Sequence, residues 1–352
     1  MTQPGDRNDP VEEVTRLLKS AAGPVNPMVL LVGPPLSGIT RSMYEAVQSC
    51  LPHGRLYRLT AADLAARPDL PSLFSGDGPH VLWLDGLTPA DLVLLGRGIL
   101  DQVLPRALVL ASIDTFWADR VLRDSSAATA PARTVLLEYA NRITVPFTLT
   151  PRERSWLREM GYPVSKGIAE SLVGGENLIK HYRRGARSNP DGHRLVQAVV
   201  DVRRCGVHRP LHEDELQSLW EAQGRCDDSL HAFRRALDWA SSIPEGATTG
   251  LLFRARGGES DAWRVLGYAA GADNGDHGHK ARPLDDGAWK RTREVFADVD
   301  DQYALGIAAH LHGRADTARL ALAHTVQVSA PEHPLAAAAD DALRSLEAEG
   351  SV

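Results

Sequence analysis

The feature that most constrains this chain is an apolar run that leads through a glycine-bounded loop into an amphipathic stretch. Residues 28–32 (MVLLV) are continuously apolar, residues 33–40 (GPPLSGIT) are rich in turn formers, and residues 40–50 show a helical spacing of apolar side chains. A short apolar run of this kind predicts a strand that is covered on both faces. The sequence therefore predicts a strand, a tight loop and a helix in immediate succession.

The loop matches the phosphate-binding template G-x-x-x-x-G-K-[ST] at all but one fixed position, in the strand–loop–helix context that the template requires. Ile39 stands where the template has lysine. The glycines let the backbone wrap a phosphate, and the first N–H groups of the helix offer it donors and the positive end of the helix dipole. The residues expected to form a vestigial nucleotide site are Gly33, Pro34, Ser37, Gly38, Ile39, Thr40 and Arg41.

A second motif is the apolar run of residues 81–84 (VLWL) that ends in Asp85, 45 residues after Thr40. In P-loop proteins an aspartate at the end of a neighbouring strand holds Mg²⁺ through water, while the hydroxyl of the loop ligates the ion directly. Thr40 and Asp85 are therefore the expected Mg²⁺ residues. Many such ATPases carry a glutamate after the aspartate to activate water, and this chain has Gly86 there.

These two replacements argue against efficient hydrolysis. A lysine ammonium about 3 Å from a phosphate oxygen contributes roughly 5 kcal/mol of attraction at an effective dielectric constant of about 20, before desolvation. A general base is typically worth about 10²–10⁴-fold in rate. Ile39 supplies no charge, Gly86 supplies no carboxylate, and Arg41 lies one residue further into the helix and is expected to point elsewhere. We expect ATP or ADP with Mg²⁺ to bind weakly at most, and we assign no catalytic residue.

The rest of the first 150 residues alternates apolar runs with amphipathic stretches. Strands separated by helices imply right-handed crossovers and a parallel sheet. The sequence thus predicts an α/β fold, with a parallel-sheet P-loop NTPase domain over residues 1–150. The predicted strands are residues 28–32, 55–59, 81–84, 107–111 and 142–146, and the predicted helices are residues 40–50, 89–104 and 132–141.

After Pro151 the strand signal fades and a mostly α-helical region is predicted. Residues 151–188, which include the basic segment Lys180–Arg187, are interpreted as a helical linker or lid. Residues 189–271 begin with a predicted turn at 189–192 and then show three helical patterns and two apolar runs, in the order of a winged helix-turn-helix. Residues 284–350 are interpreted as helices, two of which resemble one tetratricopeptide-type repeat.

The runs GPPLSGITRSMYEAV, VLWLDGL, ALVLASIDTFWADRVL and NPDGHRLVQAVVDVRRCGVHRPL resemble a group of bacterial STAND-like or AAA-type ATP-binding proteins. The resemblance implies a P-loop domain, a winged-helix segment and repeat helices in that order, with a regulatory or signal-sensing role. Members show GKT and LDE where this chain has residues 38–40 and 84–86, so the chain resembles a degenerate member. In such folds a polar residue near the end of the fourth strand senses the γ-phosphate, which makes Ser112 and Arg120 the sensor candidates.

Charge bears on the choice of partner. The net charge is −6, with a slight basic excess over residues 151–256 and an acidic excess over residues 257–352. Binding that rests on phosphate contacts needs a stronger basic bias, and Asp227 and Asp228 begin the helix that would read DNA, so nucleic acid is disfavoured. A protein partner is expected to dock on the acidic C-terminal helices, and self-association stays open. No run reaches about 18 apolar residues, so we expect no membrane contact and a cytoplasmic location.

The segment at residues 272–283 contains carboxylates and imidazoles, concentrated in residues 273–279 (DNGDHGH). Its spacing does not provide the twelfth-position carboxylate of a calcium loop or a further transition-metal ligand. We therefore expect a solvated loop there, with Gly257-Gly258 as another turn upstream.

Our leading interpretation is a catalytically impaired P-loop protein that acts as a nucleotide-sensing or purely structural scaffold. One alternative is an active ATPase that borrows a cation from Arg120, Arg123 or a neighbouring protomer, as arginine fingers do. Another alternative is a DNA-binding regulator that uses the winged helix.

Overall fold

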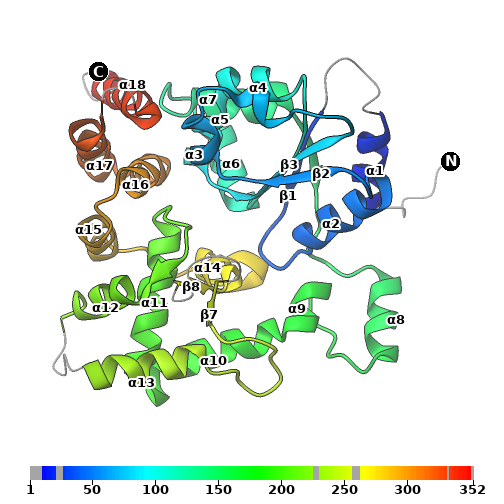
Figure 1. Ribbon diagram of the computed structural model, residues 1–352. Helices are drawn as coiled ribbons and strands as arrows, with labels where there is room; N and C mark the ends of the chain where they lie inside the picture. Colours follow the sequence, from blue (N-terminus) through cyan, green and yellow to red (C-terminus); the bar gives the residue numbers. More distant parts are fainter. Residues whose placement is uncertain (1–9, 21–26, 225–229, 256–261, 331–332, 350–352) are drawn as a thin grey trace. The chain divides into compact units, whose positions relative to one another are not determined.

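The computed structural model describes residues 10–20, 27–224, 230–255, 262–330 and 333–349 (Figure 1). Two predictions lie outside these ranges: the helix start at Asp227 and Asp228, and the turn at Gly257 and Gly258. Two compact units make up the chain. The first comprises Met1–Gly33, Gly38–Pro146 and Leu322–Val352, and the second comprises Pro34–Ser37 and Phe147–Ala321.

A five-stranded parallel sheet forms the centre of the first unit. Its strands lie in the order β2-β3-β4-β1-β5, and every pairing is parallel. The predicted α/β fold with a parallel sheet is confirmed, and because β1 leads through a glycine-bounded loop into α2, the unit has a P-loop NTPase fold. The strands are β1 (Met28–Val32), β2 (Arg55–Arg58), β3 (His80–Leu87), β4 (Leu108–Ile113) and β5 (Ala140–Thr144).

Helices cover both faces of this sheet, which is why its strands are continuously apolar. On one face Val14 of α1 and Met43 of α2 pack against Val29 and Leu31 of β1, and Figure 1 shows α5 and α7 on the other side of the strands. The helices are α1 (Pro10–Ser20), α2 (Ile39–Cys50), α3 (Ala61–Ala65), α4 (Leu70–Leu73), α5 (Pro89–Val103), α6 (Thr115–Arg123), α7 (Ala130–Thr134) with a π-helix at Val135–Tyr139, and α18 (Pro334–Glu349).

The second unit is mostly helical, as predicted, with a small antiparallel sheet in the order β6-β8-β7. Its central helix, α11, buries Leu195, Val196 and Val199 in the core. The helices are α8 (Pro151–Glu159), α9 (Ile168–Val173), α10 (Gly175–Ser188), α11 (Pro190–Arg204), α12 (Glu213–Glu221), α13 (Leu230–Ser241), α14 (Gly267–Asn274), a 3₁₀-helix at Asp276–Gly278, α15 (Asp286–Val295) and α16 (Val299–Leu311). The strands are β6 (Leu211–His212), β7 (Leu252–Arg254) and β8 (Ala262–Val265), and α17 (Ala315–Val328) contributes residues to both units.

Three local predictions are wrong. The helix predicted to reach residue 141 ends at Tyr139, because Ala140 already pairs with Met28 in β5. The turn predicted at residues 189–192 is the first turn of α11, where Asn189 accepts a hydrogen bond from the Gly192 N–H (2.9 Å) and Pro190 occupies the first helical position. Proline is well suited to that position, because its missing N–H would have no intrahelical partner there.

The third error concerns the segment predicted as a solvated loop at residues 272–283. It begins inside α14, which continues to Asn274 and buries residues 268–273. Helices without a polar face look unlike surface helices in sequence, because burial on all sides removes the usual alternation. Among the described helices, none combines the length and the apolar character that a bilayer-spanning helix requires.

Candidate functional site

The loop between β1 and α2 is anchored to the end of β4. The Gly33 N–H donates to the Ile113 carbonyl (3.3 Å), and the Gly33 carbonyl accepts from the Thr115 N–H (3.4 Å). Further along, Leu36 and Gly38 have positive φ values of 64° and 90°. Glycine adopts this conformation at no steric cost, whereas leucine is strained by about 1–2 kcal/mol. The loop is therefore a tightly specified turn that brings the chain directly into α2.

The N-terminus of α2 offers backbone donors to an anion. Gly38 is the N-cap, and no side chain caps the helix. The first N–H groups of a helix have no intrahelical partner, and with the helix dipole they favour negative charge. Ser37 is among the residues expected to form the site, but its N–H donates to the Pro34 carbonyl (3.1 Å) within the loop. The donors available to a phosphate therefore begin at the helix itself.

Ser37 nevertheless presents an unsatisfied group. Its hydroxyl oxygen is buried and has no hydrogen-bond partner. Leaving such a group unpaired costs about 1–3 kcal/mol, which a phosphate oxygen that accepts its proton would offset. This orphaned hydroxyl, next to the open end of α2, fits a loop that holds a phosphate.

Thr40, Asp85 and Ser112 come together at the carboxyl ends of β3 and β4. The Thr40 hydroxyl donates to Asp85 Oδ2 (3.0 Å), and the Ser112 hydroxyl donates to Asp85 Oδ1 (2.6 Å). A threonine hydroxyl and a carboxylate at this separation are close enough to share the shell of one Mg²⁺ ion, which prefers oxygen ligands. The donor set therefore fits the ion, with Thr40 as a direct ligand and Asp85 acting through water.

Ser112 supports Asp85 through hydrogen bonds. It is 4% exposed, and besides donating to Asp85 it accepts a hydrogen bond from the Gly86 N–H (2.7 Å). The donor and one acceptor position of its hydroxyl are thus used in positioning the chain at residues 85–86. The pairing of β3 with β4 is irregular between Leu84 and Leu87, and Gly86 has a φ of 79°. A glutamate at position 86 would be strained by this positive φ. The backbone therefore disfavours the residue that would carry a catalytic carboxylate.

At position 39, where the template has lysine, both the side chain and its surroundings are apolar. The Ile39 side chain is partly buried and packs against the core cluster that contains Met43. Arg41 pairs with Glu45 of its own helix, and Arg120 lies over the ring of Phe116 (4.4 Å to its centre). The structure thus brings Thr40, Asp85 and Ser112 together, while Arg41 is engaged along α2.

The tip of the loop, Pro34–Ser37, belongs to the second unit. A Cβ atom added to Gly267 or Gly271 of α14 would lie 3.6 Å from Pro35, and one added to Gly175 would lie 3.5 Å from Leu36. Leu36 also packs against the core cluster of that unit. This packing accounts for the strained backbone of Leu36, because the apolar contacts of its side chain offset the strain.

The carboxylates and imidazoles of residues 273–279 do not form a solvated loop. Asp273 accepts hydrogen bonds from the Tyr182 hydroxyl (3.0 Å) and from Arg282 Nε (2.8 Å). Arg282 also pairs with Asp201, and Arg204 donates to Asn274 Oδ1 (2.8 Å). Burial raises the pKa values of Asp201 and Tyr182 and lowers that of Arg204. Sequence reasoning missed this network because Tyr182, Asp201 and Arg204 lie far from residues 273–282 in the chain.

His277 lies in an aromatic cluster of the same unit. Its ring stacks on Phe147 (3.6 Å between centres) and on Tyr268 (5.2 Å), and burial lowers its pKa to about 4. The Tyr268 hydroxyl donates to the buried carboxylate of Glu170. Burial by itself would raise the pKa of Glu170, but the hydrogen bonds that it accepts lower it on balance. Among the described residues, no group of three or more His, Cys, Asp or Glu side chains is arranged to hold a metal ion.

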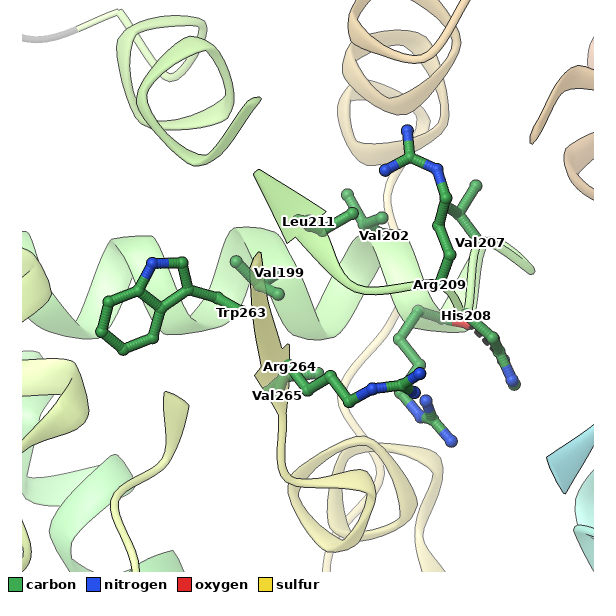
Figure 2. Close-up of a pocket in the computed structure, with 10 residues that line it drawn as sticks. Val199, Val202, Val207, His208, Arg209, Leu211, Trp263, Arg264 and Val265 are labelled. Carbon is green, nitrogen blue, oxygen red and sulfur yellow. Dashed lines mark hydrogen bonds between the residues drawn. The ribbon is translucent and has the colours of Figure 1, made fainter. Parts of the chain in front are cut away.

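A small pocket of the second unit lies beside α11 and β8 (Figure 2). Figure 2 shows His208 and the guanidinium group of Arg264 pointing to the same side, whereas Arg209 and Trp263 extend elsewhere. Arg209 is held by Glu215 (2.9 Å) and Asp301 (3.0 Å). Burial lowers the pKa of His208, and the charges of Arg203 and Arg264 lower it further. The pocket is thus cationic, and it is lined by Val199, Val202, Arg203, Val207, His208, Arg209, Leu211, Trp263, Arg264 and Val265.

Comparison with known proteins leaves the family open. No protein-family model and no curated protein matches the chain. Among solved structures, AMPPCP-bound DnaA from Aquifex aeolicus is similar at 15% identity and a TM-score of 0.31, covering 68% of this chain and 86% of that one. The Thermotoga maritima RuvB Holliday junction branch migration motor is similar at 15% identity and a TM-score of 0.30, covering 74% and 92%. Similarity at this level does not indicate what this chain does.

Proposed function

We propose that the protein is a nucleotide-binding module of the P-loop class that has lost efficient hydrolysis and serves a regulatory or structural role. The observation that carries the proposal is the hydrogen bond between Thr40 and Asp85 (3.0 Å) beside an uncapped α2 N-terminus. This arrangement supports binding of a phosphate chain with Mg²⁺. When bound, Mg²⁺ would neutralise phosphate charge, with Thr40 and Asp85 holding it.

Loss of hydrolysis follows from two positions. Ile39 packs into apolar surroundings and brings no charge to the phosphates, where a lysine would supply roughly 5 kcal/mol before desolvation. Gly86 carries no carboxylate, and its positive φ makes the return of one costly. What the chain's own residues can do is bind and orient: the first N–H groups of α2 are available to a phosphate, the buried Ser37 hydroxyl lacks a hydrogen-bond partner, and Ser112 positions Asp85.

A sensing role is supported by the backbone of the loop, in which Leu36 and Gly38 have positive φ values of 64° and 90°. Strained backbone at non-glycine residues such as Leu36 is typical of ligand clamps and switch regions, whose conformation a bound phosphate can change. We infer a switch or scaffold of the STAND or AAA type, in which Ser112 and Arg120 remain the sensor candidates.

The second unit supports the remaining parts of this proposal. The order α11, β6, α12, α13, β7, β8 with an antiparallel sheet is that of a winged helix, which we interpret as a packing module. The helices α15–α18 are interpreted as the tetratricopeptide-like segment, of which α18 belongs to the first unit and α17 contributes residues to both. Their acidic character supports docking of a protein partner with a basic surface.

The proposal is tested by calorimetric titration of the full chain with ATP and ADP, with and without Mg²⁺, beside a phosphate-release assay. We expect weak, Mg²⁺-dependent binding and turnover well below about 1 s⁻¹. Thr40→Ala and Asp85→Asn should abolish the Mg²⁺ dependence, whereas Asp77→Asn, an exposed carboxylate of the same unit, should leave it intact. Absence of binding at millimolar nucleotide overturns the proposal. Robust turnover would instead favour an active ATPase with a borrowed cation.

A further inference from the structure

The helix α10 presents two opposite faces. Its inner face buries Leu178, Ile179 and Tyr182 in the core of the second unit. Gly185 lets the neighbouring helix approach closely, because a Cβ atom there would lie 2.5 Å from the ring of Trp239 in α13. The packing of the inner face thus fixes the orientation of α10, and with it the orientation of the outer face.

The outer face carries a stripe of four cations, Lys180, Arg183, Arg184 and Arg187, which we call the α10 stripe. All four side chains are exposed. At about 100° per residue, these positions lie within an arc of about 100° on the helix surface. They also span roughly 10 Å along the helix axis at about 1.5 Å per residue. The stripe is therefore one continuous basic surface on a rigid support.

Within the described part of the chain, only one cation of this stripe has an ion pair. Lys180 pairs with Glu176 (3.3 Å), but the described residues provide no ion pair for Arg183, Arg184 or Arg187. Some other exposed helical arginines do have a carboxylate four residues away, as in the pairs Arg41–Glu45 and Arg123–Asp119, whereas Arg154 and Arg158 of α8 are four residues from each other.

Within the stripe, the residues four apart are like-charged: Lys180 with Arg184, and Arg183 with Arg187. Such pairs destabilise a helix by about 0.2–0.5 kcal/mol each. The helix thus keeps a repulsive charge pattern that an external anion would relieve.

The chemistry of the stripe favours a polyanion with phosphate groups. Arginine binds phosphate through two parallel N–H donors. Three arginines are therefore better suited to discrete phosphate groups than to a surface whose negative charge is spread out. None of the large exposed apolar side chains lies on α10. A protein interface would need an apolar or aromatic centre, and single-stranded nucleic acid would need aromatic rings on which bases stack.

We propose that the α10 stripe binds the phosphodiester backbone of a nucleic-acid duplex, without reading its sequence. A span of roughly 10 Å matches about three spacings of 3.4 Å along the duplex axis, and therefore about four phosphates of one strand. The sequence disfavoured nucleic acid because the excess of basic residues over the middle region is small. The fold changes that conclusion by placing four cations of the predicted linker on one side of a helix. The inference is independent of nucleotide binding at the P-loop.

The test is fluorescence anisotropy of a labelled 20-base-pair DNA duplex with the full chain, titrated at several salt concentrations. Four phosphate contacts predict a slope of log affinity against log salt of roughly −3.6, at about −0.9 per contact. The triple variant Arg183→Gln, Arg184→Gln, Arg187→Gln should reduce the slope to roughly −1 and weaken binding at 50 mM salt at least tenfold.

The matched control is the triple variant Arg152→Gln, Arg154→Gln, Arg158→Gln on α8, which removes the same charge from exposed arginines of the same unit. It should keep the wild-type slope. Thermal unfolding monitors the fold, and the charge reversal Arg184→Glu provides a second variant with a single change. Salt-independent binding, no binding at 50 mM salt, or equal losses in both triple variants would overturn the proposal.

Competitors identify the anion. Duplex RNA that competes as well as DNA assigns the site to backbone phosphate in general, whereas weaker competition assigns it to DNA. Single-stranded DNA should compete less well than either duplex. If polyglutamate competes as strongly as the duplex at equal charge, the stripe recognises an acidic protein surface and the nucleic-acid proposal fails.

Discussion

The two units bury different kinds of side chain. Among the described residues, the first unit buries no Asp, Glu, Lys or Arg, and β1 is wholly apolar between its helices. The second unit buries the carboxylates Glu170, Asp201, Asp273 and Asp301 together with Arg204. Burying a charge costs several kcal/mol unless it is paired and hydrogen-bonded. The comparison teaches that the first unit depends on apolar packing, whereas the second also depends on a set of ion pairs and therefore on pH.

The two proposed anion-binding surfaces differ in a complementary way. The loop at residues 33–40 has the backbone geometry of a phosphate site, but Ile39 stands at the position of its cation. The α10 stripe has the cations but presents them on an open helix surface. Backbone donors select a phosphate by shape, while exposed arginines act mainly through salt-sensitive attraction.

The largest expected effect is loss of a buried ion-pair partner in the second unit. Arg282→Ala leaves Asp201 and Asp273 without the guanidinium that bonds them, Asp273 at 2.8 Å. Breaking a buried pair in this way costs about 3–5 kcal/mol. Urea unfolding, with hydrogen exchange of α10 and α11 as the local readout, measures it. Arg97→Ala, which removes the exposed Arg97–Glu138 pair of the first unit, should cost less than about 1 kcal/mol. Equal losses would remove the contrast between the units.

The next effect is a pH dependence from His277. Its pKa is lowered to about 4 in the folded protein, against about 6.5 in the unfolded chain. Between these values the unfolded chain binds a proton that the folded protein does not, so stability present at pH 7 is lost as the pH falls. At pH 5 the loss is about 2 kcal/mol.

His277→Asn tests this, because asparagine tolerates the positive φ of 57° and does not titrate there. The variant should be less stable than wild type at pH 7 and should lose less stability between pH 7 and pH 5. His279 and the charges of Lys166 and Glu170 face the ring and are unchanged in both proteins. Parallel stability curves for the two proteins would contradict the assignment.

A smaller effect should follow from restoring the cation of the loop. Ile39→Lys should raise the affinity for ATP and ADP about tenfold, or about 1.4 kcal/mol, since much of the attraction is spent on desolvation. Calorimetric titration measures the change. The control Ile243→Lys adds the same charge at an isoleucine that is 62% exposed, and should leave nucleotide affinity unchanged. If both variants bind nucleotide equally, the gain is due to net charge and not to the loop.

The smallest effect concerns the support behind Asp85. Ser112→Ala removes the hydroxyl that bonds Asp85 (2.6 Å) and the Gly86 N–H (2.7 Å). We expect a loss of about 1 kcal/mol in stability and weaker Mg²⁺-dependent binding. Ser155→Ala, at an exposed serine of α8, should change neither. An intact Mg²⁺ dependence in Ser112→Ala would show that the carboxylate keeps its place without this support.

Particular elements show where sequence reasoning succeeds. β1 occupies residues 28–32 as predicted, because five consecutive apolar residues next to a glycine-bounded loop leave little choice other than a buried strand. The hydrogen bond between Thr40 and Asp85 also follows, since the parallel strands of one sheet end at the same edge, although β4 lies between β1 and β3, which were expected to be neighbours. By contrast, α14 has two glycines and no polar face, so nothing in its pattern distinguishes it from a loop. Its helical state depends on being buried from residue 268 to residue 273.

The amino-acid sequence alone was enough to define the strand–loop–helix frame, the parallel sheet around it and the missing cation at Ile39. All three depend on local pattern and on residue identity, which neighbouring positions reveal. Only the tertiary structure decided that Asp273 is buried with Arg282 and Tyr182, that the hydroxyl of Ser112 is shared between Asp85 and Gly86, and that four cations line one face of α10. Desolvation and charge pairing depend on which distant segments meet, and that is settled only when the chain folds.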